Sequence, residues 1–464
     1  MSSILLFSQQ VRTENKFFTT LDKVEKDTTF QQGHFAFSLR NAKTGKILAE
    51  KNADKLLQVA SCLKLFSTAT ALEILGKDFT FQTHLAYDGK IETGTLQGNL
   101  YIVGGGDPTL GSSDWAGKMN AQALLEHWAN LIIKQGIQKI NGSVIAYDGY
   151  FGEYTLPRGW IWEDIGNYYG SNVYGLNLND NEYILYLQAN KKIGQAAQIL
   201  RTEPELPFLQ FEGKILTAPK GTGDNAYIFG SPKENTRFLE GTIPQEENFA
   251  IKGALPNPPL STAYLLHQTL QKKGIALSQE PKVIKKTTNW KIIDTYHSPT
   301  LAQIIEQTNT YSINLYAEAL YRQINRDKPT NLLEFWQGKG LKIDEKNIED
   351  GSGLSHKNHV SAHHLTQLLH EMFNSTHYKA FETSLPVAAH SGTMLNWGKN
   401  SILQGNIRAK TGSMSGVVAL SGYCKTMSGE ILCFSIVANQ YKGKYSHVRQ
   451  LFEKILVELV SSKF

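Results

Sequence analysis

Segments typical of β-strands lie near both ends of this 464-residue chain, and segments typical of helices lie between them. Residues 34–50 predict two short strands joined by a turn at Ala42–Gly45, and residues 407–439 predict three more strands. Helical spacing of apolar residues covers the segments 61–75, 301–324, 332–338, 362–373 and 446–461. Strands from the two ends can share one sheet only if the chain between them leaves and returns. We therefore expect one α+β domain that is interrupted by an insertion.

The pattern of hydrophobicity changes in the middle of the chain. From about Phe79 to Trp290, short segments of alternating hydrophobicity are separated by glycine and asparagine turns, as in GNLYIVGGGDPTLG and NGSVIAYDGYFG. This pattern predicts a mostly β region of its own.

Composition excludes several classes of protein. Apolar residues make up 41% and charged residues 19%, which is ordinary globular usage. The net charge of +5 is mild and evenly spread, so we expect no nucleic-acid partner. No apolar run approaches the roughly 18 residues of a transmembrane helix. Met1–Gln10 contain Ile4-Leu5-Leu6-Phe7 without a positive start, which leaves either the end of a secretion signal, incomplete here, or a free terminus.

The chain has three cysteines, Cys62, Cys424 and Cys433, too few for a disulfide framework. Cys424 and Cys433 flank a predicted two-residue turn at Ser428-Gly429, so we expect them to lie opposite each other on a hairpin. They are then either two small apolar residues on one sheet face or a cross-strand disulfide.

Common nucleotide, hydrolase and metal signatures are missing. There is no G-x-S-x-G elbow, P-loop or Rossmann glycine fingerprint. The run Gly104–Pro108 suits a tight turn better than a phosphate-binding loop. His370-Glu371 begins a zinc-hydrolase pattern, but Asn374 stands where the second histidine ligand is needed. We expect no metal and no cofactor.

Ser61-x-x-Lys64 is the strongest candidate for chemistry. Positions i and i+3 of a helix lie on one face, so the Lys64 amine can hydrogen-bond the Ser61 hydroxyl. A serine hydroxyl is a weak nucleophile until a neighbour takes its proton, and lysine can do so when burial or another cation lowers its pKa. The spacing alone is common in a chain of this composition.

Two later segments strengthen this candidate. Ser312-Ile313-Asn314 supplies a hydroxyl that can relay a proton and an amide that can orient a substrate. Lys410-Thr411-Gly412 lies on a predicted strand, where glycine permits close approach and lysine gives a fixed positive charge. The same tripeptide at Lys43-Thr44-Gly45 falls in the predicted turn near the N-terminus, where we interpret it as structural.

The order Ser-x-x-Lys, Ser-x-Asn, Lys-Thr-Gly resembles the penicillin-binding protein and serine β-lactamase superfamily. The wider context resembles one branch, the D-alanyl-D-alanine carboxypeptidase/endopeptidase family of low-molecular-mass class C penicillin-binding proteins. It is carried by the segments GGGDPTL, DGYFG, GWIWEDIGNYYG, LNLNDN, SINLYAEAL, DGSGLS, SLPVAAHSGTM and IRAKTGSMSGVVALSGYCKT.

This resemblance implies a penicillin-binding/β-lactamase-like α+β fold, an antiparallel sheet packed by helices with a large mostly β insertion. The family inserts extra domains between its first two motifs. We accordingly place the catalytic domain at 1–85 and 290–464, and an accessory region of two subdomains at 86–289.

The resemblance also implies a serine DD-peptidase that cleaves the D-Ala-D-Ala terminus or D-alanyl crosslinks of peptidoglycan through an acyl-enzyme. Ser61 would be the nucleophile and Lys64 its general base. Ser312 would carry a proton to the leaving amine, Asn314 would hold the peptide, and Lys410 would lie near the proton path and the substrate carboxylate.

Further substrate-binding residues follow from the same resemblance. The oxyanion hole would use the backbone N–H groups of Ser61 and Ser413, beside Thr411 and Gly412. An acid and an aromatic residue of the insertion, Asp164 and Tyr169, would meet the cationic end of a diaminopimelate side chain. Leu354 and Met414 would form an apolar wall. The alternative is that Asp164 is a turn residue and Tyr169 is a core residue.

The partners implied are peptidoglycan stem peptides and β-lactam antibiotics as covalent inhibitors, and the location implied is the periplasm or another extracytoplasmic site. Two departures from the family pattern are Ile313, where aspartate is common, and Ser391, where Asp-Gly-Thr is usual. Two alternatives stay open, the first because it shares the acylation residues and the second because of these departures. One is a serine β-lactamase, and the other is a wall-binding protein that has lost turnover.

Overall fold

The computed structural model describes residues 16–153, 156–287, 289–326, 331–344 and 347–464, so the leader-like segment Met1–Gln10 lies outside the described residues. The chain divides into two compact units. The first contains the described parts of Met1–Phe79, Thr300–Ile313 and Leu320–Phe464. The second contains those of Thr80–Pro299 and Asn314–Ala319.

The first unit is built on a five-stranded antiparallel sheet in the order β19-β20-β21-β1-β2. Its strands are β1 (His34–Asn41), β2 (Ile47–Lys51), β19 (Ile407–Met414), β20 (Val417–Lys425) and β21 (Ile431–Asn439). β1 pairs with β21 from His34↔Asn439 to Asn41↔Leu432. The predicted strands at the two ends of the chain are therefore confirmed, and they share one sheet.

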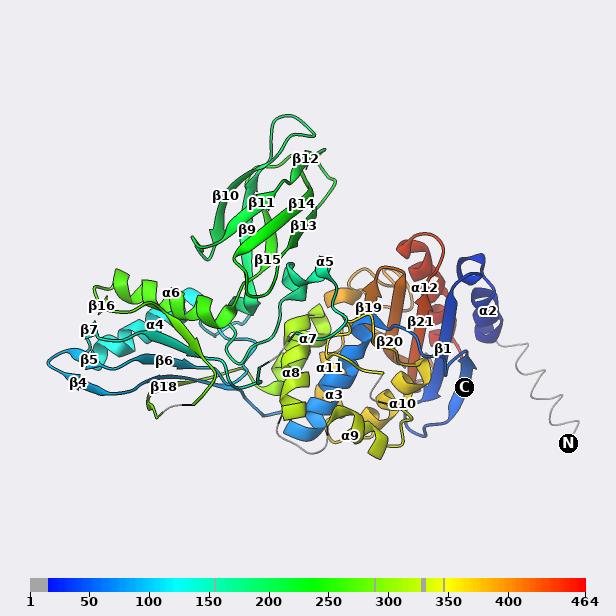
Figure 1. The fold of residues 1–464 in the computed structure, drawn as a ribbon. Helices are drawn as coiled ribbons and strands as arrows, with labels where there is room; N and C mark the ends of the chain where they lie inside the picture. The colour runs from blue at the N-terminus through cyan, green and yellow to red at the C-terminus, as the bar shows by residue number, and fades with distance from the viewer. Residues whose placement is uncertain (1–15, 154–155, 288, 327–330, 345–346) are drawn as a thin grey trace, which may run out of the picture. The chain divides into compact units, whose positions relative to one another are not determined.

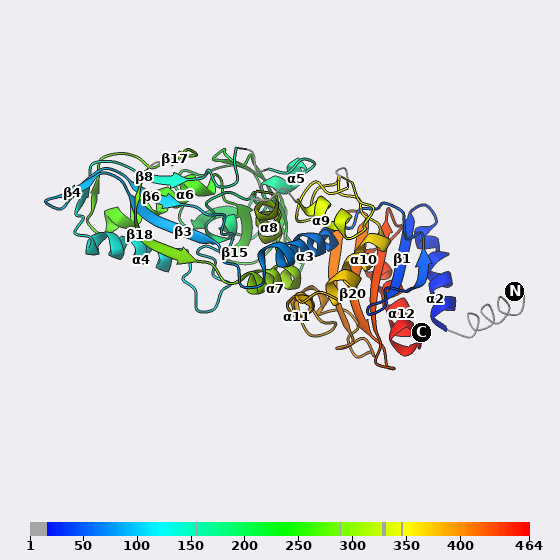
Figure 2. The ribbon, with the colours of Figure 1, turned by 90° about the horizontal axis from the view of Figure 1, so that it is seen from below.

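Helices cover both faces of this sheet (Figures 1 and 2). α2 (Lys16–Glu25) and α12 (Tyr445–Ser461) pack on one face, and α10 (Ala362–Phe373) packs on the other. Strand residues alternate between faces, so Ala409 joins the core under α2 and α12 while its neighbour Lys410 points to the opposite face.

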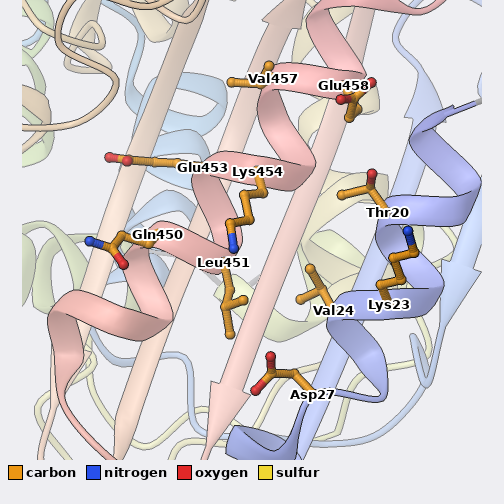
Figure 3. A pocket seen from close by; sticks show the side chains of 10 residues that line it. All are labelled: Thr20, Lys23, Val24, Asp27, Gln450, Leu451, Glu453, Lys454, Val457 and Glu458. Atoms are coloured by element: carbon orange, nitrogen blue, oxygen red, sulfur yellow. The ribbon is translucent and has the colours of Figure 1, made fainter.

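A groove of about 620 Å³ lies between α2 and α12 (Figure 3). Its lining mixes apolar and charged side chains: Thr20, Lys23, Val24, Asp27, Gln450, Leu451, Glu453, Lys454, Val457 and Glu458. This groove belongs to the helical layer on the sheet face away from Lys410.

The helix predicted after Ser61 is confirmed. A 3₁₀ turn, η2 (Ala60–Leu63), leads into α3 (Lys64–Leu75), which ends where Gly76 adopts a φ of +81°. Every residue from Lys64 to Leu72 is buried, as expected for a helix that is apolar nearly all round. The remaining helical pieces of this unit are η1 (Thr28–Phe30), α7 (Leu301–Tyr311), α9 (Leu332–Gly338), α11 (Tyr378–Ser384) and η5 (Gly392–Met394).

The periodic stretch 301–324 is two helices rather than one. α7 ends at Tyr311 and α8 (Asn314–Arg326) begins three residues later, because Ser312 has the left-handed backbone conformation with φ +63°. No glycine or proline marks this break, so apolar spacing could not reveal it.

The predicted register of the last hairpin is wrong by one residue. Its loop is Met427–Gly429, closed by the Thr426 N–H to the Glu430 carbonyl, with Gly429 at φ +88°. Cys424 therefore lies opposite Leu432, and Cys433 lies opposite Tyr423. The two cysteines point to opposite faces, and both are buried free thiols rather than a disulfide.

The second unit contains two groups of sheets. In the first group the orders are β16-β7-β5-β4 and β17-β8-β6-β3-β18. The strands are β3 (Gln82–Tyr87), β4 (Lys90–Glu92), β5 (Thr95–Gln97), β6 (Leu100–Val103), β7 (Lys139–Ile140), β8 (Val144–Tyr147), β16 (Ala276–Leu277), β17 (Lys282–Ile284) and β18 (Lys291–His297).

These sheets share a hydrophobic core with two long helices, α4 (Ala121–Lys134) and α6 (Pro258–Lys272) (Figure 1). The expectation of a mostly β region missed both helices. Their apolar residues do recur at helical spacing, as in AQALLEHWANLIIK, but the short strands and glycine turns around them dominate the local composition.

The second group has the orders β10-β9-β15 and β11-β14-β12, with β13 paired to β14. The strands are β9 (Glu182–Gln188), β10 (Gln198–Glu203), β11 (Gln210–Gly213), β12 (Leu216–Ala218), β13 (Asn225–Phe229), β14 (Thr236–Pro244) and β15 (Phe249–Ala254). They surround a core of their own, which includes Tyr183 and Leu239. The short helices α5 (Trp162–Ile165), η3 (Tyr168–Gly170) and η4 (Asn179–Asn181) precede them.

Among the described residues, no helix has both the length and the apolar character needed to cross a membrane.

Candidate active site

Ser61 and Lys64 meet at the junction of η2 and α3. Lys64 Nζ donates to Ser61 Oγ at 2.8 Å and to the Ser352 carbonyl at 2.7 Å. Lys64 is fully buried, whereas Ser61 is half-buried. The Lys64 amine therefore lies within hydrogen-bond distance of the hydroxyl whose proton it is expected to take.

A loop from the DGSGLS segment fixes the Lys64 amine from the other side. The Asp350 carboxylate accepts hydrogen bonds from the Gly353 N–H at 2.8 Å and the Ser355 N–H at 2.6 Å. Gly353 has a φ of +83°, and a Cβ there would lie 2.0 Å from the Ala60 carbonyl oxygen. The loop therefore fits against the residue before Ser61 only with glycine at this position.

Ser312 and Lys410 form a second hydroxyl–lysine pair. Lys410 Nζ donates to Ser312 Oγ at 2.8 Å and to the Thr411 carbonyl at 2.8 Å. Lys410 is fully buried, and this burial lowers its pKa from 10.5 to about 8. The left-handed backbone at Ser312 ends α7 there, which leaves the hydroxyl at the break between helices.

The strand β19 joins the two pairs. Cys62 Sγ donates to the Lys410 carbonyl at 3.1 Å, and burial raises the pKa of this thiol to about 11. A Cβ at Gly412 would lie 2.2 Å from the Val59 carbonyl oxygen and 3.2 Å from the Ser61 backbone nitrogen. Glycine thus lets β19, the outermost strand of the sheet, run against the turn that carries Ser61.

The segment around Ser391, one of the two departures from the family pattern, has a clear local role. Thr411 Oγ1 donates to Thr393 Oγ1 at 2.8 Å, so the Ser391-Gly392-Thr393 segment contacts the Lys-Thr-Gly strand. Ser391 Oγ accepts the Val387 N–H at 2.9 Å. An aspartate oxygen at this position could accept the same N–H.

Asn314, Tyr169 and Asp164 come together in the second unit. Asn314 Nδ2 donates to the Tyr169 carbonyl at 2.7 Å. Burial raises the pKa of Tyr169, and the charge of Asp164, to which its hydroxyl is hydrogen-bonded, raises it further. Both Tyr169 and Asp164 are half-buried. Residues predicted from two segments far apart in the sequence, Asp164 and Tyr169 from one and Asn314 from the other, therefore form one contact cluster.

A buried network fixes the start of α8, which carries Asn314. The Tyr316 hydroxyl donates to Asp180 Oδ1 at 2.7 Å and accepts from Trp115 Nε1 at 3.0 Å. Ser112 Oγ donates to Asp180 Oδ2 at 2.6 Å. Burial raises the pKa of Asp180 to about 7. Tyr316 lies two residues after Asn314, so this network holds the first turn of the helix.

Three other predicted residues lie at the edges of the first unit's site. Ser413 is exposed on β19, Met414 is half-buried at the end of β19, and Leu354 is half-buried two residues after Ser352. Their roles toward a substrate stay predictions.

Sequence reasoning missed several residues that hold the site. The Ser352 carbonyl, Gly353 and Asp350 all belong to DGSGLS, a segment singled out for resemblance but given a role only at Leu354. Asp180 similarly belongs to LNLNDN. The signal was a polar, glycine-rich cluster between periodic segments, which predicts a loop but not its contacts.

Among the described residues, no group of three or more histidine, cysteine, aspartate or glutamate side chains is arranged to hold a metal ion.

Known proteins resemble this chain over most of its length. A model of the D-Ala-D-Ala carboxypeptidase 3 (S13) family matches residues 18–457. A D-alanyl-D-alanine carboxypeptidase from Actinomadura sp. strain R39 is 26% identical over 446 residues, 91% of this chain and 81% of that protein. The crystal structure of penicillin binding protein 4 from Haemophilus influenzae matches with a TM-score of 0.80 at 23% identity, covering 96% of this chain and 99% of that one. A structure of the Haemophilus protein with a β-lactam has a TM-score of 0.74 at 22% identity, covering 94% and 98%.

Gly412→Ala should destabilise the first unit. Its Cβ would meet a backbone carbonyl at 2.2 Å, so the strand or the η2 turn must shift, and such overpacking costs about 1–3 kcal/mol. Gly338→Ala is the matched control, since no atom lies within 4 Å of a Cβ there and its φ is outside the left-handed region. Denaturant unfolding measures both. Equal stability of the two variants would contradict the close approach of β19.

Proposed function

The chain belongs to the D-Ala-D-Ala carboxypeptidase 3 (S13) family, and on this premise we propose that it is a serine DD-peptidase of peptidoglycan. It removes the terminal D-alanine of stem peptides, cleaves D-alanyl crosslinks, or does both. One observation carries the proposal. The Ser61–Lys64 and Ser312–Lys410 pairs each have an oxygen–nitrogen distance of 2.8 Å and a fully buried lysine. The two pairs are joined because the Cys62 thiol donates to the Lys410 carbonyl, and because Gly412 lies against the turn that carries Ser61.

Acylation begins at Ser61. Lys64 takes the hydroxyl proton as Ser61 Oγ attacks the carbonyl carbon of the penultimate D-alanine. The carbonyl oxygen becomes negatively charged, and the backbone N–H groups of Ser61 and Ser413 stabilise it. These donors act mainly on the transition state, so they lower the barrier more than they strengthen substrate binding.

The leaving amine needs a proton for the C–N bond to break. Ser312 gives its hydroxyl proton to that nitrogen and regains one through Lys410, whose ammonium donates to Ser312 Oγ. The free D-alanine, or the crosslinked peptide, then departs. In the second half of the reaction water attacks the acyl carbon and gives a proton through Ser312 to the now neutral Lys410, while Lys64 returns its proton to Ser61 Oγ as the ester bond breaks. In a β-lactam the leaving nitrogen stays attached to the acyl group, which favours a persistent adduct.

The cluster of Asp164, Tyr169 and Asn314 supports a role in substrate choice. A carboxylate beside a half-buried aromatic ring favours a side chain that ends in an ammonium group, as in diaminopimelate. Asn314 would hold the peptide amide, while Leu354 and Met414 contribute apolar contacts. The accessory region, with the proposed bounds 86–289 and two subdomains, would thus select the stem peptide.

The substrate also implies the location. Peptidoglycan lies outside the cytoplasmic membrane, so we place the enzyme in the periplasm or an equivalent extracytoplasmic space. Stem peptides are its substrates, and β-lactam antibiotics are its covalent inhibitors.

Intact-mass spectrometry after penicillin treatment tests the acyl-enzyme. The wild type should gain the mass of one penicillin, and Ser61→Ala should gain none because it lacks the nucleophile. The matched control is Ser413→Ala, which keeps its backbone N–H and should still be acylated. A wild-type protein that gains no mass would contradict the proposal. Rapid steady-state hydrolysis of a chromogenic cephalosporin would indicate a β-lactamase instead.

The pH dependence of kcat/KM tests Lys410. Its pKa of about 8 means that the amine is charged below this pH and neutral above it, so activity on a D-Ala-D-Ala peptide should fall as the pH rises through 8. Lys410→Arg keeps its charge at any accessible pH, and its profile should lack this fall even if its rate is lower. Profiles of the same shape would show that Lys410 is not the titrating group.

A further inference from the structure

A row of exposed aromatic rings lies on the second unit. The rings of Trp162 and Phe229 are 6.5 Å apart with planes 21° from parallel, and those of Phe229 and Tyr227 are 6.2 Å apart with planes 27° from parallel. Trp162 is 54% exposed and Tyr227 is 46% exposed. Exposed aromatic side chains in contact with one another are characteristic of a binding surface.

The row continues across a sheet face. Residues alternate along β13 and β14, so the buried Ile228 and Leu239 face the core while their neighbours face solvent. Phe238, 53% exposed, pairs directly with Phe229. Glu240 pairs with Tyr227, and Glu212 of β11 pairs with Phe238. We call Trp162, Tyr227, Phe229 and Phe238 the aromatic face, and its flanking carboxylates are Glu212 and Glu240.

The support under Trp162 is rigid. A Cβ at Gly166, the residue that ends α5, would lie 2.0 Å from the Ile228 carbonyl oxygen, so α5 sits directly on β13. Asn167 Oδ1 accepts the Ile228 N–H at 3.2 Å, and the Gly166 carbonyl accepts the Ala254 N–H at 2.9 Å. Trp162 is therefore held beside Phe229 by backbone contacts of the helix that carries it.

The chemistry of this face favours a carbohydrate. A pyranose ring has an apolar C–H side that stacks on aromatic rings and hydroxyls that donate to carboxylates such as Glu212 and Glu240. The core of a protein–protein interface is instead depleted in glutamate, and here the exposed Glu212 and Glu240 pair directly with Phe238 and Tyr227. A neutral, hydroxyl-rich ligand fits both features.

Helix α5 links the aromatic face to the cluster of Asp164, Tyr169 and Asn314. Asn314 contacts Tyr169, Tyr169 contacts Asp164, and Asp164 shares the four-residue helix α5 with Trp162. A peptide held by Asn314 and Asp164 would extend its sugar-bearing end past this helix. We propose that the aromatic face binds the glycan strand to which the stem peptide is attached, an inference that rests on the proposed function for the identity of the sugar.

Two substrates separate glycan binding from peptide binding. One is a stem peptide without sugar, and the other is the same peptide on a disaccharide or longer glycan. For Trp162→Ala combined with Tyr227→Ala, KM for the glycan-bearing substrate should rise about four- to hundredfold, because one aromatic stacking contact is worth about two- to tenfold and the variant removes two. KM and kcat for the free peptide should stay within error. Tyr445→Ala, an exposed aromatic of the first unit, is the matched control and should change neither.

An unchanged KM for the glycan-bearing substrate, or an equal rise for both substrates, would overturn the inference. A second readout keeps it testable if the wild type cleaves neither substrate and the proposed function fails. Peptide-free glycan chains should quench wild-type tryptophan fluorescence, and the double variant should lose this binding. Concentration-dependent self-association that needs Trp162, without glycan binding, would show that the face is a dimer interface and would also overturn the inference.

Discussion

The close approach of β19 to the turn before α3 is the contact on which the candidate site depends. Gly412 leaves no room for a side chain against the Val59 carbonyl, and the Cys62 thiol donates to the Lys410 carbonyl beside it. These two contacts join residues near the two ends of the chain. β19 pairs with β20 in the sheet that also holds β21 and β1, and the turn η2, which carries Ser61, packs against β19 and β20. Strand β19 and the turn that carries Ser61 are thus held against each other.

The candidate site contains two fully buried lysines. Lys64 is held by a hydroxyl and a carbonyl oxygen, and Lys410 by another hydroxyl and carbonyl. Burial alone already brings the pKa of Lys410 close to neutral pH. In the proposed mechanism, protons pass between serine hydroxyls and lysine amines, and no histidine side chain takes part.

Much of the fold follows from sequence because its signals are local. Strand alternation predicted β1, β2 and β19–β21, and helical spacing predicted α3, α9, α10 and α12. The errors came where one residue decides the geometry. Ser312 breaks a helix through its backbone conformation, and the hairpin loop before β21 has three residues instead of two. Helices α4 and α6 were hidden by the strands around them.

The residues of the candidate site were likewise predictable only in part. Motif order pointed to Ser61, Lys64, Ser312 and Lys410, and these four form two hydrogen-bonded pairs. The residues that position these groups were not predictable. The Ser352 carbonyl and Gly353 act on the Lys64 side through a backbone atom and a close approach, and Asp180 acts through a buried contact with the helix that carries Asn314. Such roles depend on tertiary packing, which spacing along one sequence does not report.

Digestion of purified crosslinked muropeptides, with products resolved by mass, tests the central claim most directly. The wild type should release D-alanine from pentapeptides or convert crosslinked dimers into monomers, and Ser61→Ala should leave both unchanged. Intact muropeptides after prolonged incubation with wild-type protein that penicillin still acylates would contradict the account. That result would identify a wall-binding protein that keeps the reactive serine but not turnover.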